Sequence, residues 1–288
     1  MSREHASDYD GVTTARCERA LVTLLGDLGP WSERIFLVGG LAPRYIVGQL
    51  PAGAPTHIGT TDVDLVIGLA LGDDTPETYR TLETNLKRAG FSAENSFRWT
   101  RLVDGISVQV EFLCETTEVE AGRIFKPKGE SLGSGLGAFN VRGAQLVASD
   151  YTEHEVEAER LDDGGLSTVV VLVCGLLTYV VLKILAFQDR HDNKDAYDLV
   201  FCLINFGDGP ESAGTAAATS PVALHAQVAD SLRLLGERFV DVDHDGPASY
   251  AAFLALGDDA DETARLRREA VAAVRSFLSA FEASVTAG

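Results

Sequence analysis

Two aspartates, Asp62 and Asp64, stand two residues apart in the run Gly59-Thr-Thr-Asp-Val-Asp-Leu-Val-Ile67. The apolar, β-branched residues around them predict a largely buried strand, in which residues i and i+2 point to the same face. Two adjacent carboxylates repel each other strongly in such surroundings. A divalent cation relieves this repulsion, and hard cations such as Mg²⁺ prefer carboxylate oxygens. The pair therefore indicates a metal site that transfers phosphoryl or nucleotidyl groups.

Asp-x-Asp alone is a weak signal, because an acidic strand end in a turn gives the same pattern. Three further segments strengthen it by adding a glycine turn, a third acid within an apolar strand, and a lysine followed by two more acids. They are Ile35-Phe-Leu-Val-Gly-Gly-Leu-Ala42, Ile106-Ser-Val-Gln-Val-Glu-Phe-Leu113, and Lys183 to Arg190 followed by Lys194-Asp-Ala-Tyr-Asp-Leu199.

The order Gly-Gly, Asp-x-Asp, third acid, Lys-x-x-Ala and Lys-Asp-x-x-Asp-Leu resembles that of the AbiEii/AbiGii-type nucleotidyltransferases, which include the MenT-like toxins. These belong to the DNA polymerase β nucleotidyltransferase superfamily. The motifs span residues 39–199, about half of the chain, and their combination is far more specific than any one of them. The resemblance implies an α/β (α+β) fold, with a small mixed sheet flanked by helices and a helical C-terminal part.

The resemblance also assigns roles to particular residues. Asp62, Asp64 and Glu111 would hold two Mg²⁺ ions, or Mn²⁺ in their place, that bridge the triphosphate and the attacking oxygen. Lys183 would contact the triphosphate. Catalytic residues are then Asp62, Asp64, Glu111, Lys183, Asp195 and Asp198, and nucleotide-binding residues are Gly39, Gly40, Thr61, Lys183 and Arg190.

Several of these roles have structural alternatives. Glu111 would otherwise pair with an arginine across a hairpin, such as Arg98 or Arg101, although its lone inward position favours the metal. The lysine and Arg190 would otherwise extend their charges to solvent. Asp195 is favoured as the essential acid, as a base or a partner of Lys183, whereas Asp198 would equally cap or brace its helix. The three histidines His57, His154 and His191 are given no chemistry.

Gly39 and Gly40 let the backbone approach a phosphate, and the helix expected after them would point its N-terminus at the anion. A tight strand–helix turn is the commoner cause of such a pair. Leu41 follows where the family often has serine, so one hydroxyl contact to phosphate would be missing. The interval from Gly40 to Asp62 is also long for the superfamily. Both departures concern catalytic efficiency more than the type of reaction.

The composition is that of a soluble globular protein of 288 residues with a net charge of −19. Such a charge argues against a protein that coats nucleic acid non-specifically. Its four separated cysteines indicate buried free thiols in a reducing cytoplasm, and the N-terminus has no apolar signal region. The uncharged stretch 166–182 is interpreted as a buried strand at Val169–Val173 and a turn at Gly175, followed by a helix, rather than a membrane span.

Periodicity and turn residues predict a nucleotidyltransferase core over residues 1–150 and a mainly helical domain over 151–288 that contributes Lys183 and Asp195 to the site. Helices are expected at 12–27, about 41–48, 75–89, 175–190, 193–205, 221–237, 247–256 and 261–283. Strands are expected at 34–38, around Asp62, at 97–103 and at 106–114, with a hairpin at Asp104-Gly105. The stretch 207–220 is expected to be an exposed linker.

Residues 121–143 are basic and rich in glycine, which is typical of a solvated loop. A segment that binds phosphate or the acceptor beside the active site is the alternative. The glycine run lacks Gly-Lys-Ser/Thr, so a P-loop ATPase is excluded.

The predicted function is transfer of NMP from an NTP to an acceptor hydroxyl. The resemblance further implies a toxin of a toxin–antitoxin or phage-defence system that acts on tRNA and has a cognate antitoxin. Two alternatives remain open at this point. One is modification of a small molecule, such as a cationic aminoglycoside, or of a protein. The other is an inactive nucleotidyltransferase fold that acts as a binding partner. No membrane is expected to be involved.

Overall fold

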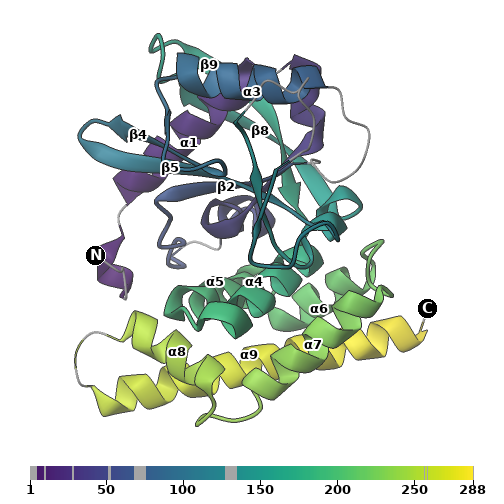
Figure 1. Cartoon of the computed structure of the whole chain (residues 1–288). Coiled ribbons are helices and arrows are strands. Elements are labelled where there is room, and N and C mark those ends of the chain that lie inside the picture. Colours follow the sequence, from purple (N-terminus) through teal and green to yellow (C-terminus); the bar gives the residue numbers. More distant parts are fainter. Residues whose placement is uncertain are drawn as a thin grey trace. The chain divides into compact units, whose positions relative to one another are not determined.

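The computed structural model describes residues 5–9, 11–27, 29–50, 53–67, 76–126, 135–255, 257 and 259–287. The chain forms two compact units (Figure 1). The sheet unit comprises Asp10–Ala42 and Gly59–Cys174, and the helical unit comprises Met1–Tyr9, Pro43–Ile58 and Gly175–Gly288.

Nine strands of the described residues form one mixed sheet in the order β3-β4-β5-β2-β1-β9-β8, with β7 also pairing β5 and β6. β2 runs parallel to β5, and β1 runs antiparallel to β2 and parallel to β9. The fold is therefore mixed α/β, as expected. The strands are β1 Ile35–Val38, β2 Asp62–Ile67, β3 Ser92–Ala93, β4 Arg98–Val103, β5 Ile106–Cys114, β6 Ile124–Phe125, β7 Ala138–Asn140, β8 Tyr151–Glu159 and β9 Leu166–Cys174.

The two faces of the central strands differ sharply. Val63 and Leu65 of β2 are fully buried, as are Val110 and Phe112, which lie opposite them in β5. Helices α1 (Gly11–Gly26) and α3 (Pro76–Arg88) contact each other, and α1 contacts β2, β5, β8 and β9. The alternation of the strands places the Asp-x-Asp side chains on the opposite face from these apolar residues.

The predicted elements of the sheet unit are largely confirmed. Helix α1 buries an apolar stripe that includes Ala20, Leu21, Leu24 and Leu25. The hairpin between β4 and β5 turns at Asp104-Gly105, as predicted, with positive φ at both residues. All four cysteines are buried, and none of them forms a disulfide.

The helix expected after Gly40 is much shorter than predicted. A single 3-10 turn, Gly39–Leu41, is followed by one helical turn, α2 (Pro43–Ile46). Pro43 begins the second turn, where its missing N–H costs nothing. An element this short has almost no summed dipole, so the predicted anion site at its N-terminus is not supported.

The basic segment 121–143 is also not wholly a loop. It contains β6 and β7, and Asn140 anchors the preceding turn by donating to the carbonyls of Thr116 (3.0 Å) and Val119 (2.8 Å). Residues 127–134, which hold much of the glycine run, lie outside the described part of the chain.

The predicted division at residue 150 differs from the observed one, which falls between Cys174 and Gly175. The hairpin of β8 and β9 causes the difference, because its second strand pairs with β1 and completes the sheet. The polar outer strand β8 was not predicted at all. Strand β9 is longer than the expected 169–173, and only its last four residues are buried.

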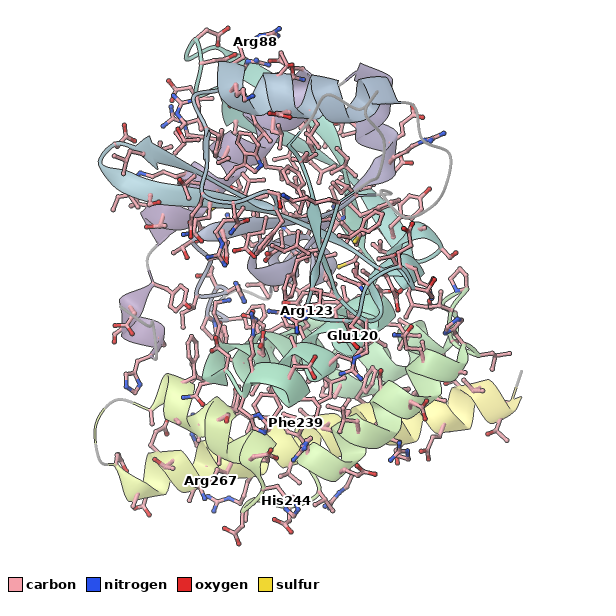
Figure 2. All side chains as sticks on the ribbon, in the orientation of Figure 1. Arg88, Glu120, Arg123, Phe239, His244 and Arg267 are labelled. Carbon is pink, nitrogen blue, oxygen red and sulfur yellow. The ribbon has the colours of Figure 1, made fainter. Side chains whose placement is uncertain are left out.

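The helical unit contains α4 to α9, of which α4 and α5 begin and end within one residue of prediction. Phe239 lies buried among these helices, whereas the side chains of His244 and Arg267 extend from their edge (Figure 2). The helices are α4 Leu176–Arg190, α5 Asn193–Asn205, α6 Pro210–Ala218, α7 Ala226–Arg238, α8 Asp245–Leu254 and α9 Ala260–Ala287.

The predicted linker 207–220 is wrong, because it contains helix α6. Its small residues serve packing: a Cβ on Gly214 would collide with the backbone of Phe277 in α9. Ala213 and Ala217 are buried. The composition that indicated a loop therefore reflects a close helix–helix approach.

By length and composition alone, helix α9 could cross a membrane, although only 33% of its most apolar window is buried. It packs against α6, α7 and α8 within the helical unit. Core helices of soluble domains meet the same criteria, so this is weak evidence for a membrane protein. The α/β fold is of the soluble type.

Candidate functional site

The three predicted metal-binding acids lie on one face of two neighbouring strands of the sheet unit. Asp64 of β2 stands opposite Glu111 of β5 in the parallel ladder, and Asp62 lies two residues before Asp64. Residues in register on parallel strands share a face, so the three carboxylates project from the same side. All three side chains are half-buried. The sequence prediction of a shared face is confirmed.

Glu111 is engaged by an arginine. Arg98 of β4 lies opposite it in the ladder, and the Arg98 Nε atom donates to Glu111 Oε1 at 2.6 Å. Partial burial opposes the charged form of Arg98, but the adjacent Glu111 carboxylate outweighs it and raises the pKa of the guanidinium. The structure therefore shows the arginine partner that the sequence left as an alternative, and a metal role for Glu111 remains a prediction.

Asp62 is held by the residues that lead into β2. The buried Thr60 hydroxyl donates to Asp62 Oδ1 at 2.5 Å, and Thr60 N donates to the hydroxyl of Thr14 in α1 at 3.1 Å. Thr61 contributes its carbonyl to Gln109 N at 3.4 Å. Its predicted contact with nucleotide stays untested.

Gly39 lies directly against the Asp64 carboxylate. Its φ of +68° is in the left-handed region, and an added Cβ would overlap both the carboxylate and the Cβ of Asp64. Val38, the residue before it, stands opposite Asp64 in the antiparallel ladder. Glycine is thus required at position 39 for backbone conformation and for space. Gly39 therefore has a structural reason that does not involve a bound phosphate.

Replacing Gly39 by alanine should destabilise the sheet unit and displace Asp64. We expect a loss of about 2–5 kcal/mol in unfolding free energy, since left-handed strain of roughly 1–2 kcal/mol adds to overpacking of about 1–3 kcal/mol. Gly105→Ala is the matched control, because Gly105 has a φ of +80° and no atom within 4 Å of an added Cβ. Urea unfolding of both variants measures the difference, and equal losses would exclude the proposed overlap.

The carboxylates fit a hard cation in donor type and in register, because oxygen ligands from Asp64 and Glu111 face one another across adjacent strands. Among the residues that the structure describes, however, no group of three His, Cys, Asp or Glu side chains is arranged to hold a metal ion. Glu111 would have to exchange its ion pair with Arg98 for a metal ligand.

The other predicted residues form a buried charge network within the helical unit. Lys183 of α4, only 7% exposed, donates to Asp195 Oδ1 at 3.0 Å and to Asp198 Oδ2 at 2.7 Å. Burial disfavours the charged ammonium, but Asp198 and Asp195 outweigh it and raise the pKa of Lys183. The Lys183 ammonium is therefore bound by two carboxylates of its own unit.

Two more cations complete the network, each on a different aspartate. Arg190 makes a bidentate pair with Asp195, with distances of 2.6 and 2.7 Å, and Lys194 lies 2.8 Å from both oxygens of Asp198. Although burial favours the neutral acids, Lys183 and these cations hold the pKa values of Asp195 and Asp198 below the ordinary value. Three cations face two carboxylates, so the network carries one excess positive charge.

His57 is the member of this network that the sequence did not reveal. Its Nε2 lies 2.9 Å from Asp198 Oδ1, and its ring stacks on Tyr197. Burial lowers the pKa of His57 despite the neighbouring carboxylate. A lone histidine in the proline-containing loop before β2 carries no spacing signal, so only the fold brings it to Asp198.

The lowered pKa of His57 predicts a pH-dependent stability. Below the unfolded-state pKa near 6.5, the unfolded chain binds a proton that the native His57 does not, so stability falls as the pH decreases toward the native pKa. The slope attributable to His57 is at most about 1.4 kcal/mol per pH unit. We expect His57→Gln to remove this part of the dependence between pH 7 and 5. Urea unfolding at several pH values measures it, and an unchanged slope would contradict the assignment.

Comparison with known proteins adds nothing to these observations, since no protein-family model, no curated protein and no solved structure matches the chain.

Proposed function

We propose that this chain is a metal-dependent nucleotidyltransferase that moves NMP from an NTP to an acceptor hydroxyl. The observation that carries the proposal is the register of the sheet, in which Asp64 stands opposite Glu111 and Asp62 shares their face. The closeness of Gly39 to Asp64 supports it, because the acid is fitted into a position that tolerates no side chain beside it.

The residues of this face have distinct proposed roles. Asp62, Asp64 and Glu111 would hold Mg²⁺, which would neutralise phosphate charge and acidify the acceptor hydroxyl. Arg98, which is in register with Glu111, becomes available to the triphosphate when Glu111 turns to the metal. The acceptor oxygen bonds to the α-phosphorus, the α–β phosphoanhydride bond breaks, pyrophosphate leaves and the hydroxyl proton passes to solvent.

The buried charge network of the helical unit also supports the proposal, because its net charge is positive. Its single excess positive charge suits a polyanionic substrate, and Arg190 is the cation with a largely exposed side chain, at 59%. Within the helical unit we therefore propose Arg190, rather than Lys183, as the residue that binds nucleotide, and a bracing role for Asp195 and Asp198. This revises the roles that the family resemblance implied.

The proposed setting is a cytoplasmic toxin that modifies tRNA and is restrained by an antitoxin. An inactive binding protein is the second candidate, and the observed Glu111–Arg98 and Lys183–Asp198 pairs favour it, because both satisfy the charged groups without a ligand.

Incubation with each α-labelled NTP and Mg²⁺, with total tRNA, aminoglycosides or cell protein as acceptor, separates the candidates. We expect label on one acceptor class and none in the presence of EDTA. Absence of both label transfer and NTP binding would favour the binding protein. Growth arrest on expression would support the toxin, and harmless expression would count against it.

A further inference from the structure

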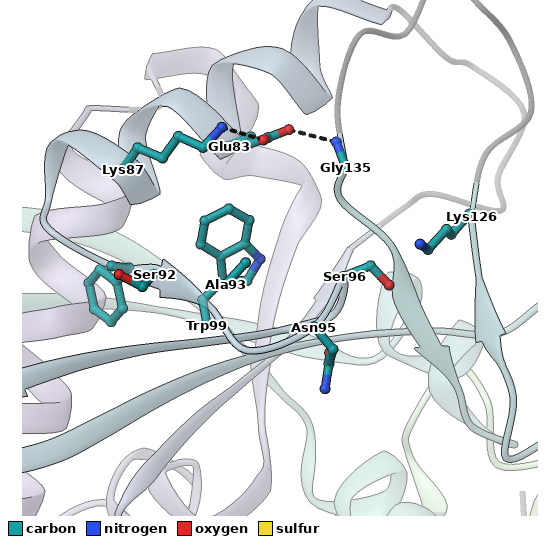
Figure 3. Close-up of a pocket in the computed structure, with 10 residues that line it drawn as sticks. Glu83, Lys87, Ser92, Ala93, Asn95, Ser96, Trp99, Lys126 and Gly135 are labelled. Carbon is teal, nitrogen blue, oxygen red and sulfur yellow. Dashed lines mark hydrogen bonds and ion pairs between the residues drawn. The ribbon is translucent and has the colours of Figure 1, made fainter.

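An open pocket of about 500 Å³ lies in the sheet unit, within the size range of small-molecule sites (Figure 3). Trp99 lines it. Trp99 is the neighbour of Arg98 in β4 and stands opposite Val110 rather than Glu111. Because successive strand residues point to opposite faces, this pocket lies across the sheet from the carboxylates. An inference about it does not rest on the proposed nucleotidyl transfer.

The Trp99 indole supplies an unused hydrogen-bond donor. The side chain is 2% exposed, and no described residue accepts from its buried Nε1. Figure 3 shows the indole amid the lining residues, with its nitrogen edge turned toward the side where Ser96 lies. An indole N–H only donates, and a buried one usually has an acceptor. A bound molecule that carries an acceptor would satisfy it.

The charged groups of the pocket favour an anion. Glu83 of α3 is already engaged on both oxygens, by Lys87 at 2.6 Å and by the Gly135 backbone N–H at 2.8 Å. Lys126 also lines the pocket, so its two lysines exceed the single carboxylate by one charge. Phe91 and Trp99 provide an aromatic wall. Together these groups suit a ring with an anionic substituent.

We propose that this pocket binds a small aromatic anion, a ring that carries a carboxylate or a phosphate. Its anionic oxygens accept from the Trp99 indole N–H in the field of Lys126, and its ring packs on the aromatic wall. Both parts of the ligand are needed. Its anionic group accepts from the Trp99 indole N–H, and its apolar ring covers the aromatic side chains.

The test is the indole ¹⁵N–¹H resonance of Trp99 in the full-length chain. The sequence has two tryptophans, so Trp31→Phe or Trp99→Phe assigns the signal. Titration with phenyl phosphate or with benzoate should shift this resonance downfield until it saturates. The ligand with the higher affinity shows whether the pocket prefers a phosphate or a carboxylate. Inorganic phosphate and benzyl alcohol should each shift it at least fivefold less. No shift with either aromatic anion, or an equal shift with inorganic phosphate or benzyl alcohol, would overturn the proposal.

Two matched substitutions test the role of charge. Lys126→Met should weaken the binding of the aromatic anion about fivefold or more. Arg123→Met removes an exposed cation three residues away that does not line the pocket, and should leave the affinity unchanged (Figure 2). Equal affinities of the Lys126→Met variant and the unmodified chain would overturn the proposed contact.

Discussion

Replacing Asp64 by asparagine should abolish nucleotidyl transfer, by more than about 1000-fold, while the protein remains folded. Removal of one metal-binding carboxylate removes several kcal/mol of transition-state charge stabilisation, and each 1.4 kcal/mol corresponds to a factor of ten in rate. Asparagine has nearly the same shape as aspartate, so the close contact with Gly39 is kept. Transfer of label from the preferred NTP measures the effect.

A control must show that the loss is specific to this face of the sheet. Glu155→Gln removes a charge from exposed β8 of the same unit, and should leave transfer unchanged. Circular dichroism and urea unfolding establish that both variants fold. Transfer that persists in Asp64→Asn would exclude the metal role of this acid, and loss in both variants would indicate a general effect of charge.

The Glu111–Arg98 pair adds a requirement to the metal hypothesis, because Glu111 must leave this arginine before it can bind a metal ion. An ion pair at 2.6 Å satisfies a carboxylate that the sequence presented as isolated among apolar residues. The sequence predicted the shared face of Asp62, Asp64 and Glu111, because strand periodicity determines it. The two-residue turn at Asp104-Gly105 sets Val103 opposite Ile106 and therefore Arg98 opposite Glu111. This register makes the arginine pair possible, but it does not decide whether Glu111 keeps the arginine or binds a metal ion.

The elements that were predicted correctly are those with strong local sequence signals. Helix α5 has strong periodicity and an aspartate N-cap at Asp192, so its bounds 193–205 follow from local signals. Strand β8 has glutamate at alternate positions and few apolar residues, so its pattern resembles that of an exposed segment. Helix α6 resembles a linker because its close packing on α9 requires small residues such as Gly214. Both failures arise where long-range contacts select residues that local propensity disfavours.

Replacing Lys183 by methionine should destabilise the helical unit strongly, by roughly 3 kcal/mol or more. Lys183→Met removes the buried cation that contacts both carboxylates, and breaking a buried ion pair costs about 3–5 kcal/mol. The value should lie near the lower limit, because Asp195 keeps Arg190 and Asp198 keeps Lys194. Urea unfolding of the full chain measures it. A loss below about 1 kcal/mol would show that the network is not a stabilising centre.

A double-mutant cycle then tests whether the two charges act together. Asp198→Asn alone should also destabilise the unit, but Lys183→Met with Asp198→Asn should cost less than the two single losses combined, by about 1–3 kcal/mol. Strict additivity would show that the 2.7 Å contact between them carries no coupling.

These stability losses decide how a loss of activity at Lys183 is interpreted. A Lys183→Ala protein that no longer arrests growth would be expected simply because it unfolds, so that result alone does not show contact with triphosphate. Arg190→Met is the informative comparison, because its side chain is mostly exposed and Asp195 keeps its contact with Lys183, so the stability loss should be smaller than for Lys183→Met. We expect the Arg190→Met protein to stay folded and to bind NTP at least tenfold more weakly in equilibrium dialysis. Unchanged NTP affinity in this variant would return the triphosphate contact to Lys183, and would require the Lys183 ammonium to leave Asp195 and Asp198 when nucleotide binds.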